Sequence, residues 1–224
     1  IYRGLVGSEM CIRDRPITIK YLLLKSLFNK RYFIVIGIID CGGANLQSIK
    51  SSLDSLNIDS ITSNDWSILQ DCNGYIIPGV GAAKNVMDTL HIKSLVKRIK
   101  TINKPVLGIC IGMQILYDYS EEDGQKCLSI IKGKVKKFND SGLAVPQMGW
   151  NKVNFNKDHN FLDGYYYFAN SYYADPSEYT LGKSNYGVQI SSFIKKDNFY
   201  GVQFHPEKSS KQGKKFLKFF LDQL

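Results

Sequence analysis

The sequence has few cysteines and no long apolar run. Its five cysteines lie at positions 11, 41, 72, 110 and 127. Their odd number and the lack of a C-x-x-C pair argue against a disulfide framework or a zinc site and favour a reducing cytoplasm. No apolar stretch reaches the roughly 20 residues that a membrane-spanning helix needs, and repeats and low-complexity tracts are missing. We therefore expect a cytoplasmic globular domain with no metal or cofactor and no membrane partner.

The net charge of +9 is concentrated at the start of the chain. Residues 1–33 carry seven basic and two acidic side chains, so they contribute +5 to the net charge of +9. The remaining excess is mild, and the lysine runs at 132–137 and 208–215 are typical of solvated faces. The 14 tyrosines could stack on bases, but no basic face accompanies them. A nucleic-acid partner is therefore not expected.

Residues 1–33 are interpreted separately from the rest. The stretch 5–14 resembles the translation of a transposon-end sequencing adapter, which suggests a non-native, sequence-assembly artefact. A disordered leader is the alternative, and the apolar run at 22–24 is too short and too broken by lysines for a secretory signal. We assign the functional domain to residues 34–224.

From residue 34 onward, short apolar runs alternate with helical patterns. Runs without polar alternation are typical of strands buried on both faces of a parallel sheet, and they occur at 34–39, 74–77 and 105–109. Helical spacing of apolar residues follows at 45–56, with Asn45 as a candidate N-cap, at 87–102, and from 113. Strand-like pieces then occupy 132–138, 151–155, 165–169, 186–194 and 199–204, before an amphipathic helix over 211–224. This order predicts a flavodoxin-like α/β fold in three layers, with a mostly parallel central sheet and an additional antiparallel region.

The segment 108–112 places a cysteine between two glycines in the pattern G-x-C-x-G. A predicted strand ends here and a helix begins, and a nucleophile on such a sharp turn needs small neighbours. At a helix start, Cys110 would experience the positive end of the helix dipole, which favours the thiolate. The amide of Ile111 points to where an oxyanion would form. A buried structural cysteine between two packing glycines is the plainer alternative.

A second candidate group follows the predicted strand at 199–204. His205 is followed two positions later by Glu207, and residues i and i+2 of an extended segment lie on the same side. Glu207 can then hold one ring nitrogen of His205, which leaves the other to take a proton from Cys110. Elsewhere a histidine beside a glutamate is more often a surface pair, but catalytic groups of α/β proteins gather at strand ends.

Together the two segments resemble the class I glutamine amidotransferases, and the resemblance covers nearly all of residues 34–224. It implies that Cys110, His205 and Glu207 are catalytic and that 78–81 is an oxyanion strand, in which Gly79 or Val80 presents an amide beside that of Ile111. It also implies four positions that bind the substrate L-glutamine, namely Gln114, Glu122, Ser171 and Tyr172.

Four segments, at 78–87, 147–151, 165–168 and 205–209, look like those of the glutaminase subunits of imidazole glycerol phosphate synthases. This resemblance implies a heterodimer with a (β/α)₈-barrel cyclase subunit, contacted by Met148, Trp150 and Asn151, and a role in histidine biosynthesis. Gln147 and Asn170 depart from the pattern, because histidine is usual at both places. The partner of a related surface-sugar amination pathway therefore remains an alternative. So do a stand-alone cysteine hydrolase and a non-catalytic binding module.

Overall fold

The computed structural model of the protein describes residues 34–42, 46–79, 81–139 and 142–224. The expectations for residues 1–33, for Asn45 as an N-cap and for Val80 therefore lie outside the described residues.

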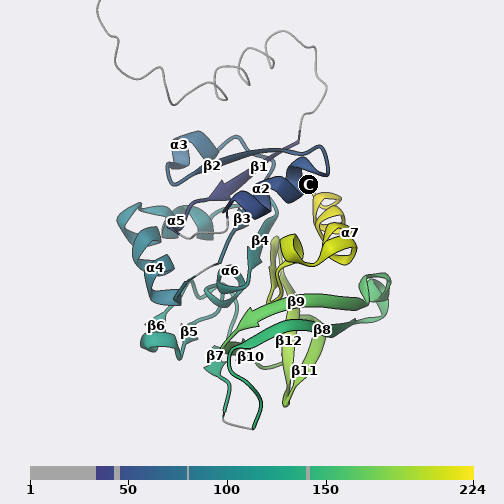
Figure 1. The fold of residues 1–224 in the computed structure, drawn as a ribbon. Coiled ribbons are helices and arrows are strands. Elements are labelled where there is room, and N and C mark those ends of the chain that lie inside the picture. The colour runs from purple at the N-terminus through teal and green to yellow at the C-terminus, as the bar shows by residue number, and fades with distance from the viewer. Residues whose placement is uncertain (1–33, 43–45, 80, 140–141) are drawn as a thin grey trace, which may run out of the picture. The chain divides into compact units, whose positions relative to one another are not determined.

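A nine-stranded sheet in the order β2-β1-β3-β4-β13-β12-β11-β8-β9 forms the centre of the fold (Figure 1). Its first five strands are parallel and the remaining four are antiparallel. The parallel strands are β2 (Asp59–Ser63), β1 (Val35–Ile39), β3 (Gly74–Ile77), β4 (Val106–Ile109) and β13 (Phe199–Val202). The antiparallel strands are β12 (Val188–Lys196), β11 (Thr180–Tyr186), β8 (Gln147–Phe155) and β9 (Gly164–Asn170). The predicted α/β fold with an additional antiparallel region is confirmed.

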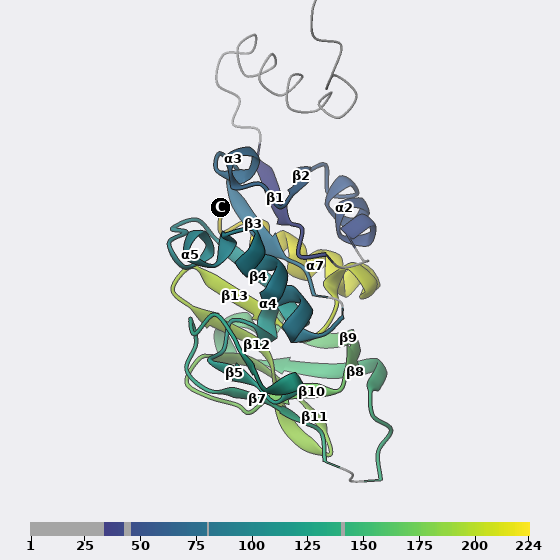
Figure 2. The same ribbon diagram turned by 90° about the vertical axis from the view of Figure 1, so that its left-hand side faces the viewer.

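Helices cover both faces of the parallel strands, which gives the three layers (Figures 1 and 2). On one face lie α2 (Leu46–Asp54) and α7 (Ser210–Leu221), and on the other lie α4 (Ala83–Ile92) and α5 (Leu95–Lys100). The apolar stripe of α7 is buried as its spacing predicts, at Phe216, Leu217, Phe220 and Leu221. Two short helices, α3 (Trp66–Leu69) and α6 (Ile111–Gln114), follow β2 and β4.

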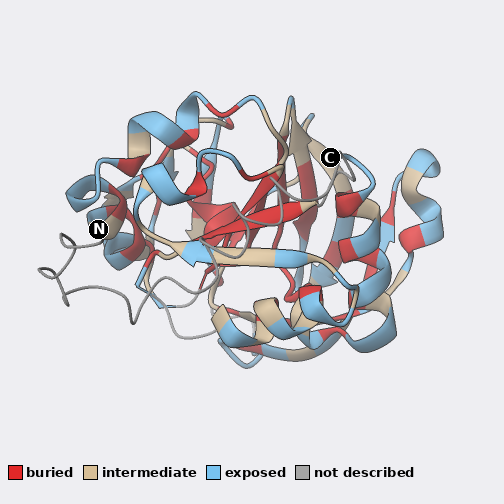
Figure 3. Ribbon diagram, turned by 90° about the horizontal axis from the view of Figure 1, so that it is seen from above, coloured by how far each residue is buried: buried red, intermediate tan, exposed pale blue. Residues whose placement is uncertain are grey.

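Because helices lie on both sides, the inner parallel strands have no solvent-facing side. Every residue of β1, β3, β4 and β13 is buried, and these strands run through the buried centre of the molecule in Figure 3. The apolar runs at 34–39, 74–77 and 105–109 thus correspond to buried strands, as predicted.

A second, smaller sheet in the order β10-β7-β5-β6 lies beside the antiparallel half. It consists of β10 (Tyr172–Ala174), β7 (Lys134–Lys137), β5 (Tyr119–Ser120) and β6 (Gln125–Lys126). Three 3₁₀ helices complete the described elements: η1 (Glu122–Gly124), η2 (Lys157–Leu162) and η3 (Pro206–Lys208).

Three sequence predictions about single elements differ from the structure in their bounds or number of elements. The helix expected over 87–102 begins earlier and is two helices, because Ser94 adopts a left-handed conformation (φ 55°) between α4 and α5. The strand expected over 186–194 is confirmed from Val188 onward as β12, but the preceding strand β11 was not predicted, and Gly187 (φ 71°) turns the chain between the two. The helix expected from residue 113 begins two residues sooner and has only one turn.

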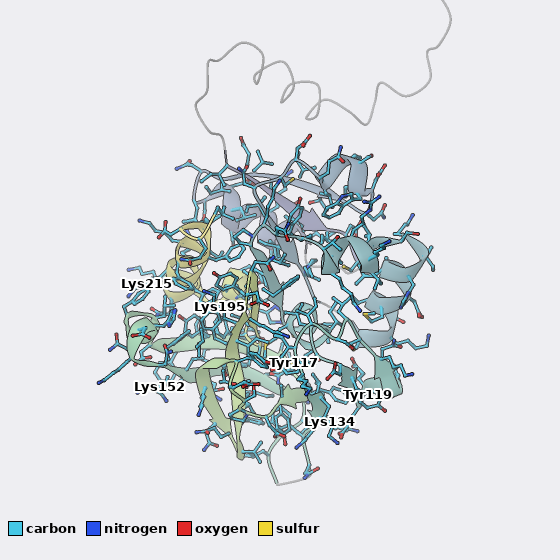
Figure 4. The ribbon with its side chains drawn as sticks, turned by 180° about the vertical axis from the view of Figure 1, so that it is seen from behind. Tyr117, Tyr119, Lys134, Lys152, Lys195 and Lys215 are labelled. Atoms are coloured by element: carbon cyan, nitrogen blue, oxygen red, sulfur yellow. The ribbon has the colours of Figure 1, made fainter. Side chains whose placement is uncertain are left out.

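Positive charge is spread over the described surface and is not gathered in one patch. The lysines labelled in Figure 4 come from β7, β8, β12 and α7, namely Lys134, Lys152, Lys195 and Lys215. All but one of the lysines in the runs 132–137 and 208–215 are exposed, and Lys136 is half-buried. These runs are therefore solvated faces, as their composition predicts.

Candidate active site

Three neighbouring parallel strands end at the same edge of the sheet and bring the candidate residues together. Gly79 follows β3, Cys110 follows β4, and His205 lies three residues beyond the end of β13. The last residues of β4 and β13 are register partners, and the amide of Cys110 donates to the carbonyl of Val202 at 2.7 Å. Groups far apart in sequence therefore meet at this edge, as in other open α/β sheets.

Cys110 lies on a strained turn between β4 and α6. Its backbone (φ 53°, ψ −108°) is in the left-handed region that non-glycine residues rarely occupy. A β-carbon on Gly108 would lie 2.4 Å from the carbonyl oxygen of Gly112, and one on Gly112 would lie 2.0 Å from that of Ile77. The G-x-C-x-G pattern is thus required by close backbone packing. Since α6 has only four residues, its dipole contributes less than the sequence prediction assumed.

His205 is held by both its side chain and its backbone. Its Nδ1 lies 2.8 Å from Oε1 of Glu207. Its amide donates to the carbonyl of Tyr167 at 2.8 Å, and its carbonyl accepts from Oγ of Ser209 at 2.6 Å. That Oγ in turn accepts from the amide of Tyr167 at 2.9 Å. The expected contact with Glu207 is present, but it is made through the 3₁₀ turn η3 and not through an extended segment.

The electrostatics of His205 favour its protonated form. Burial alone would lower its pKa, because a charged group loses solvation. Hydrogen bonding to Cys110 and Glu207 outweighs burial and raises the pKa of His205 to about 10. A protonated imidazole next to the sulfur is the arrangement that supports a reactive thiolate.

The raised pKa of His205 predicts that the fold loses stability in alkali. In the unfolded chain an imidazole has a pKa of about 6.5, so the folded protein binds this proton more tightly. The stabilisation is full below that pH and is lost as the pH rises toward about 10. We expect the urea midpoint of unfolding to fall over this range, and to fall less in His205→Asn. Equal slopes for both proteins would contradict the prediction.

A pocket of about 350 Å³ opens at this edge of the sheet. Most of the predicted site residues line it, and they are Gly79, Cys110, Ile111, Gln114, Met148, Glu122, Ser171, Tyr172 and His205. Glu207 lies behind His205, and Val80 is outside the described residues. The structure thus brings together residues that are spread over more than half of the chain.

Gly79 packs directly on the turn that carries Cys110. A β-carbon on Gly79 would lie 2.3 Å from the amide nitrogen of Ile111 and 2.4 Å from that of Gly112. Only a residue without a side chain allows the segment after β3 to approach these amides so closely. The predicted oxyanion residues Gly79 and Ile111 are therefore immediate neighbours.

Glu122 has a structural contact in addition to its place in the pocket. Helix α4 has Ala82 at its N-cap position, and alanine has no side-chain acceptor for the first amides. The carboxylate of Glu122 accepts from the amide of Ala83 at 2.6 Å instead. Burial raises the pKa of Glu122, although the bond from Ala83 acts in the opposite direction. Glu122 thereby fixes the start of α4, which closely follows the predicted oxyanion strand.

The three residues predicted to contact a partner do not all lie on one face. Met148 and Trp150 are 68% and 54% exposed and point to the same side of β8. They lie next to Ala169 and Tyr167 of β9, and Met148 also lines the pocket. Asn151 lies on the opposite face, where its Nδ2 donates to the carbonyl of Asn185 at 2.9 Å.

Sequence reasoning missed several residues of this site. Gln203 and Ser209 are fully buried and contact Cys110 and His205, and Lys208 lines the pocket. Gln147 and Asn170, the two departures from the family pattern, are direct cross-strand partners in β8 and β9. The sequence did offer one signal for Gln203, which is a polar residue between the apolar Val202 and Phe204 and lies two positions before His205. No signal at the level of sequence links residues 147 and 170.

Comparison with known proteins agrees with this geometry. The family model described as glutamine amidotransferase class-I matches residues 37–224. The "Imidazole glycerol phosphate synthase subunit HisH" of Haemophilus influenzae is 43% identical over 196 residues, which cover 85% of this chain and 98% of that protein. The protein of the same name from Buchnera aphidicola subsp. Acyrthosiphon pisum is 41% identical over 191 residues, covering 83% of this chain and 97% of that protein.

Solved structures support the fold independently. A crystal structure of a glutamine amidotransferase superposes with a TM-score of 0.67 at 17% identity and covers 84% of this chain and 97% of its own. The structure of PurLQS from Thermotoga maritima gives a TM-score of 0.62 at 15% identity, covering 84% of this chain and 98% of its own. At such identities the likeness concerns the fold alone, whereas the family model and the relatives above define membership. The chain belongs to the class-I glutamine amidotransferase family, in the branch of the imidazole glycerol phosphate synthase subunit HisH.

Proposed function

We propose that this protein hydrolyses L-glutamine to glutamate and ammonia, and that it passes the ammonia to a cyclase subunit of imidazole glycerol phosphate synthase. The observation that carries the reaction is the convergence of Cys110, His205 and Glu207 at one end of a pocket. These residues would serve as the nucleophile, the base that exchanges protons with it and the carboxylate that orients the base, which is the arrangement used for covalent amide hydrolysis.

In the proposed reaction, the sulfur of Cys110 attacks the side-chain amide carbon of glutamine. The oxyanion that forms is held by the amide of Ile111 and by an amide of 79–80, since Gly79 packs against that turn. His205 donates its proton to the departing nitrogen, so ammonia leaves and a γ-glutamyl thioester remains. Water then attacks the thioester, gives its proton to His205 and releases glutamate, which restores the thiolate.

The substrate is proposed to bind along the remaining wall of the pocket. Gln114 is buried, and its Oε1 has no hydrogen-bond partner among the described residues. The residue also lines the pocket, so a ligand bound there would contact Gln114. Ser171 and Tyr172 line the same pocket, as does the carboxylate-bearing Glu122. The ammonium group of glutamine is the part of the substrate that supplies N–H donors to acceptors such as these.

The partner is proposed to dock on the exposed face of the hairpin β8–β9. This face carries large apolar side chains, of which Trp150 is 54% and Tyr165 is 61% exposed. Exposed aromatic clusters of this kind are typical of protein interfaces. Since Met148 belongs both to this face and to the pocket lining, a partner that covers the face lies next to the site where ammonia forms.

We further propose that the functional domain spans residues 34–224 and acts in the cytoplasm, in histidine biosynthesis. The domain limits are supported by the family match over 37–224 and by β1, which begins at Val35. Among the described ranges, every helix is too short or too polar to cross a bilayer. The free thiols Cys41, Cys72, Cys110 and Cys127 fit a reducing compartment.

The proposed function is tested by measuring whether glutamine hydrolysis depends on the partner. Glutamate release by the full chain should rise about 5- to 150-fold when the histidine-pathway cyclase is added together with its ligand, the usual range of coupling between two sites. Trp150→Glu should lose this increase because it places a charge in the docking face. Ile92→Glu, at a 79% exposed apolar position on α4, is the matched control and should keep it.

Each alternative function has its own outcome in this assay. A rate that is already maximal without any partner would show a stand-alone hydrolase. An increase with a surface-sugar pathway cyclase, and none with the histidine-pathway cyclase, would show the related amination pathway. No hydrolysis under any condition would refute the enzyme.

A further inference from the structure

A buried glutamine contacts the sulfur of Cys110 from outside the expected catalytic set. Gln203 has none of its surface exposed, and its Nε2 lies 3.6 Å from Sγ of Cys110, within hydrogen-bonding range of a sulfur acceptor. The residue follows β13 directly and precedes His205 by two positions. The reaction outlined above assigns no task to this amide.

The orientation of the Gln203 amide is fixed by a chain of hydrogen bonds that starts at the backbone. The carbonyl oxygen of Tyr172 can only accept, so the group of Gln114 that lies 3.1 Å from it must be the Nε2 donor. The same Nε2 lies 3.0 Å from the Gln203 side chain, which therefore presents its Oε1 there. The remaining Nε2 of Gln203 must then face the sulfur. A flipped amide would place two donors, or two acceptors, against each other.

We propose that Gln203 is a catalytic residue of the glutamine hydrolysis, in which its amide donates a hydrogen bond to the Cys110 thiolate and aims the sulfur into the pocket. The assignment of the reaction rests on the proposed function, but the contact with the sulfur does not. A hydrogen bond to a charged acceptor in a buried site is stronger than one between neutral groups. Removing the donor should therefore disfavour the thiolate and slow its attack.

The same chain of bonds connects the sulfur with the substrate space. Gln114 orients Gln203 through its Nε2, and the same residue lines the pocket. A substrate that packs against Gln114 would hold its amide in the orientation that Gln203 requires. Substrate binding and thiolate stabilisation thus depend on one side chain.

The decisive measurement is the pH dependence of Cys110 alkylation by iodoacetamide in the isolated full chain, with modification mapped by mass spectrometry. It needs neither glutamine nor a partner. Other described thiols interfere little, because burial raises the pKa of Cys41 to about 12 and those of Cys72 and Cys127 to about 11. The other ionisable groups around the site, namely Glu122, Tyr172, His205, Glu207 and Lys208, stay unchanged in every variant.

Gln203→Met keeps the side-chain volume and removes the donor. The pH of half-maximal alkylation should rise by about one to two units, and kcat of the complex should fall about 10- to 100-fold with little change in KM. Gln203→Asn, which keeps the amide but shortens its reach, should shift the profile in the same direction. Gln189→Met, at an exposed position of β12, is the control and should behave like the wild type.

A role in packing alone would give a different result. The folded variants would then unfold at lower temperature but keep the alkylation profile of the wild type, and this outcome would overturn the proposal. If the profile shifts while the wild-type complex hydrolyses no glutamine, the contact with the thiolate stands and the proposed function fails. The two ideas are therefore tested separately.

Discussion

Replacing Cys110 by alanine is expected to reduce glutamine-dependent ammonia release by at least about 10⁴-fold, because the amide carbon then has no nucleophile. The side chain is small and 3% exposed, so the fold should be retained. The measurement is glutamate formation by the complex with the cyclase partner. The same complex should still use added ammonium salts if, as proposed, the cyclase partner carries the acceptor site.

Cys127→Ala is the matched control for this substitution. Cys127 is also a buried thiol, but burial raises its pKa to about 11 and it does not line the pocket. Its removal should leave the rate within about threefold of the wild type, as for most changes outside a site. A Cys110→Ala variant as active as this control would refute covalent catalysis at position 110.

Gly112→Ala is expected to destabilise the fold by about 3 kcal/mol or more and to lower the activity of the remaining folded protein at least about 10²-fold. The added β-carbon would lie 2.0 Å from the carbonyl oxygen of Ile77, which is backbone inside a buried strand and cannot move away. Relief of the overlap has to shift the turn that carries Cys110. Urea unfolding and the rate per folded molecule measure the two effects.

Gly164→Ala provides the comparison. The new β-carbon would there lie 2.9 Å from the side-chain amide carbon of Gln212, which can shift more easily than backbone because it belongs to a flexible side chain, at the expense of its bonds to the carbonyls of Leu162 and Asp163. We expect a loss of stability below about 1 kcal/mol and a normal rate. If both alanine variants behaved alike, the steric explanation of the second glycine in G-x-C-x-G would be wrong.

The sequence was sufficient to predict the parts of the fold that are buried on both faces. Runs such as 74–77 have no polar residue, and burial between two helical layers is the physical reason. Strand β2, of sequence DSITS, was not predicted, because at the edge of the sheet it is mostly polar and only partly buried. Strand β11, of sequence TLGKSNY, was also not predicted, because most of its residues are polar or glycine.

For the site, local motifs predicted Cys110, His205 and Glu207, since each is accompanied by neighbours that its chemistry needs. Contacts that depend on tertiary packing could not be predicted in this way. Ser209 bonds both Tyr167 and His205 across two elements, and Gln203 meets Gln114 over 89 residues of sequence. The opposite case is Asn151, which is adjacent to Trp150 in the sequence but lies on the other face of the sheet, because neighbouring residues of β8 point to opposite sides.

Strand β9 connects the exposed face of the β8–β9 hairpin with His205. On its outer face, Tyr167 packs edge-on against Trp150, with ring centroids 6.2 Å apart, and through its backbone the same residue holds both His205 and Ser209. A change of this outer surface that creates a binding site for a new protein would therefore also change how the backbone of Tyr167 positions His205. Substitutions on the exposed face of β8–β9 and substitutions around His205 should therefore have coupled effects on activity.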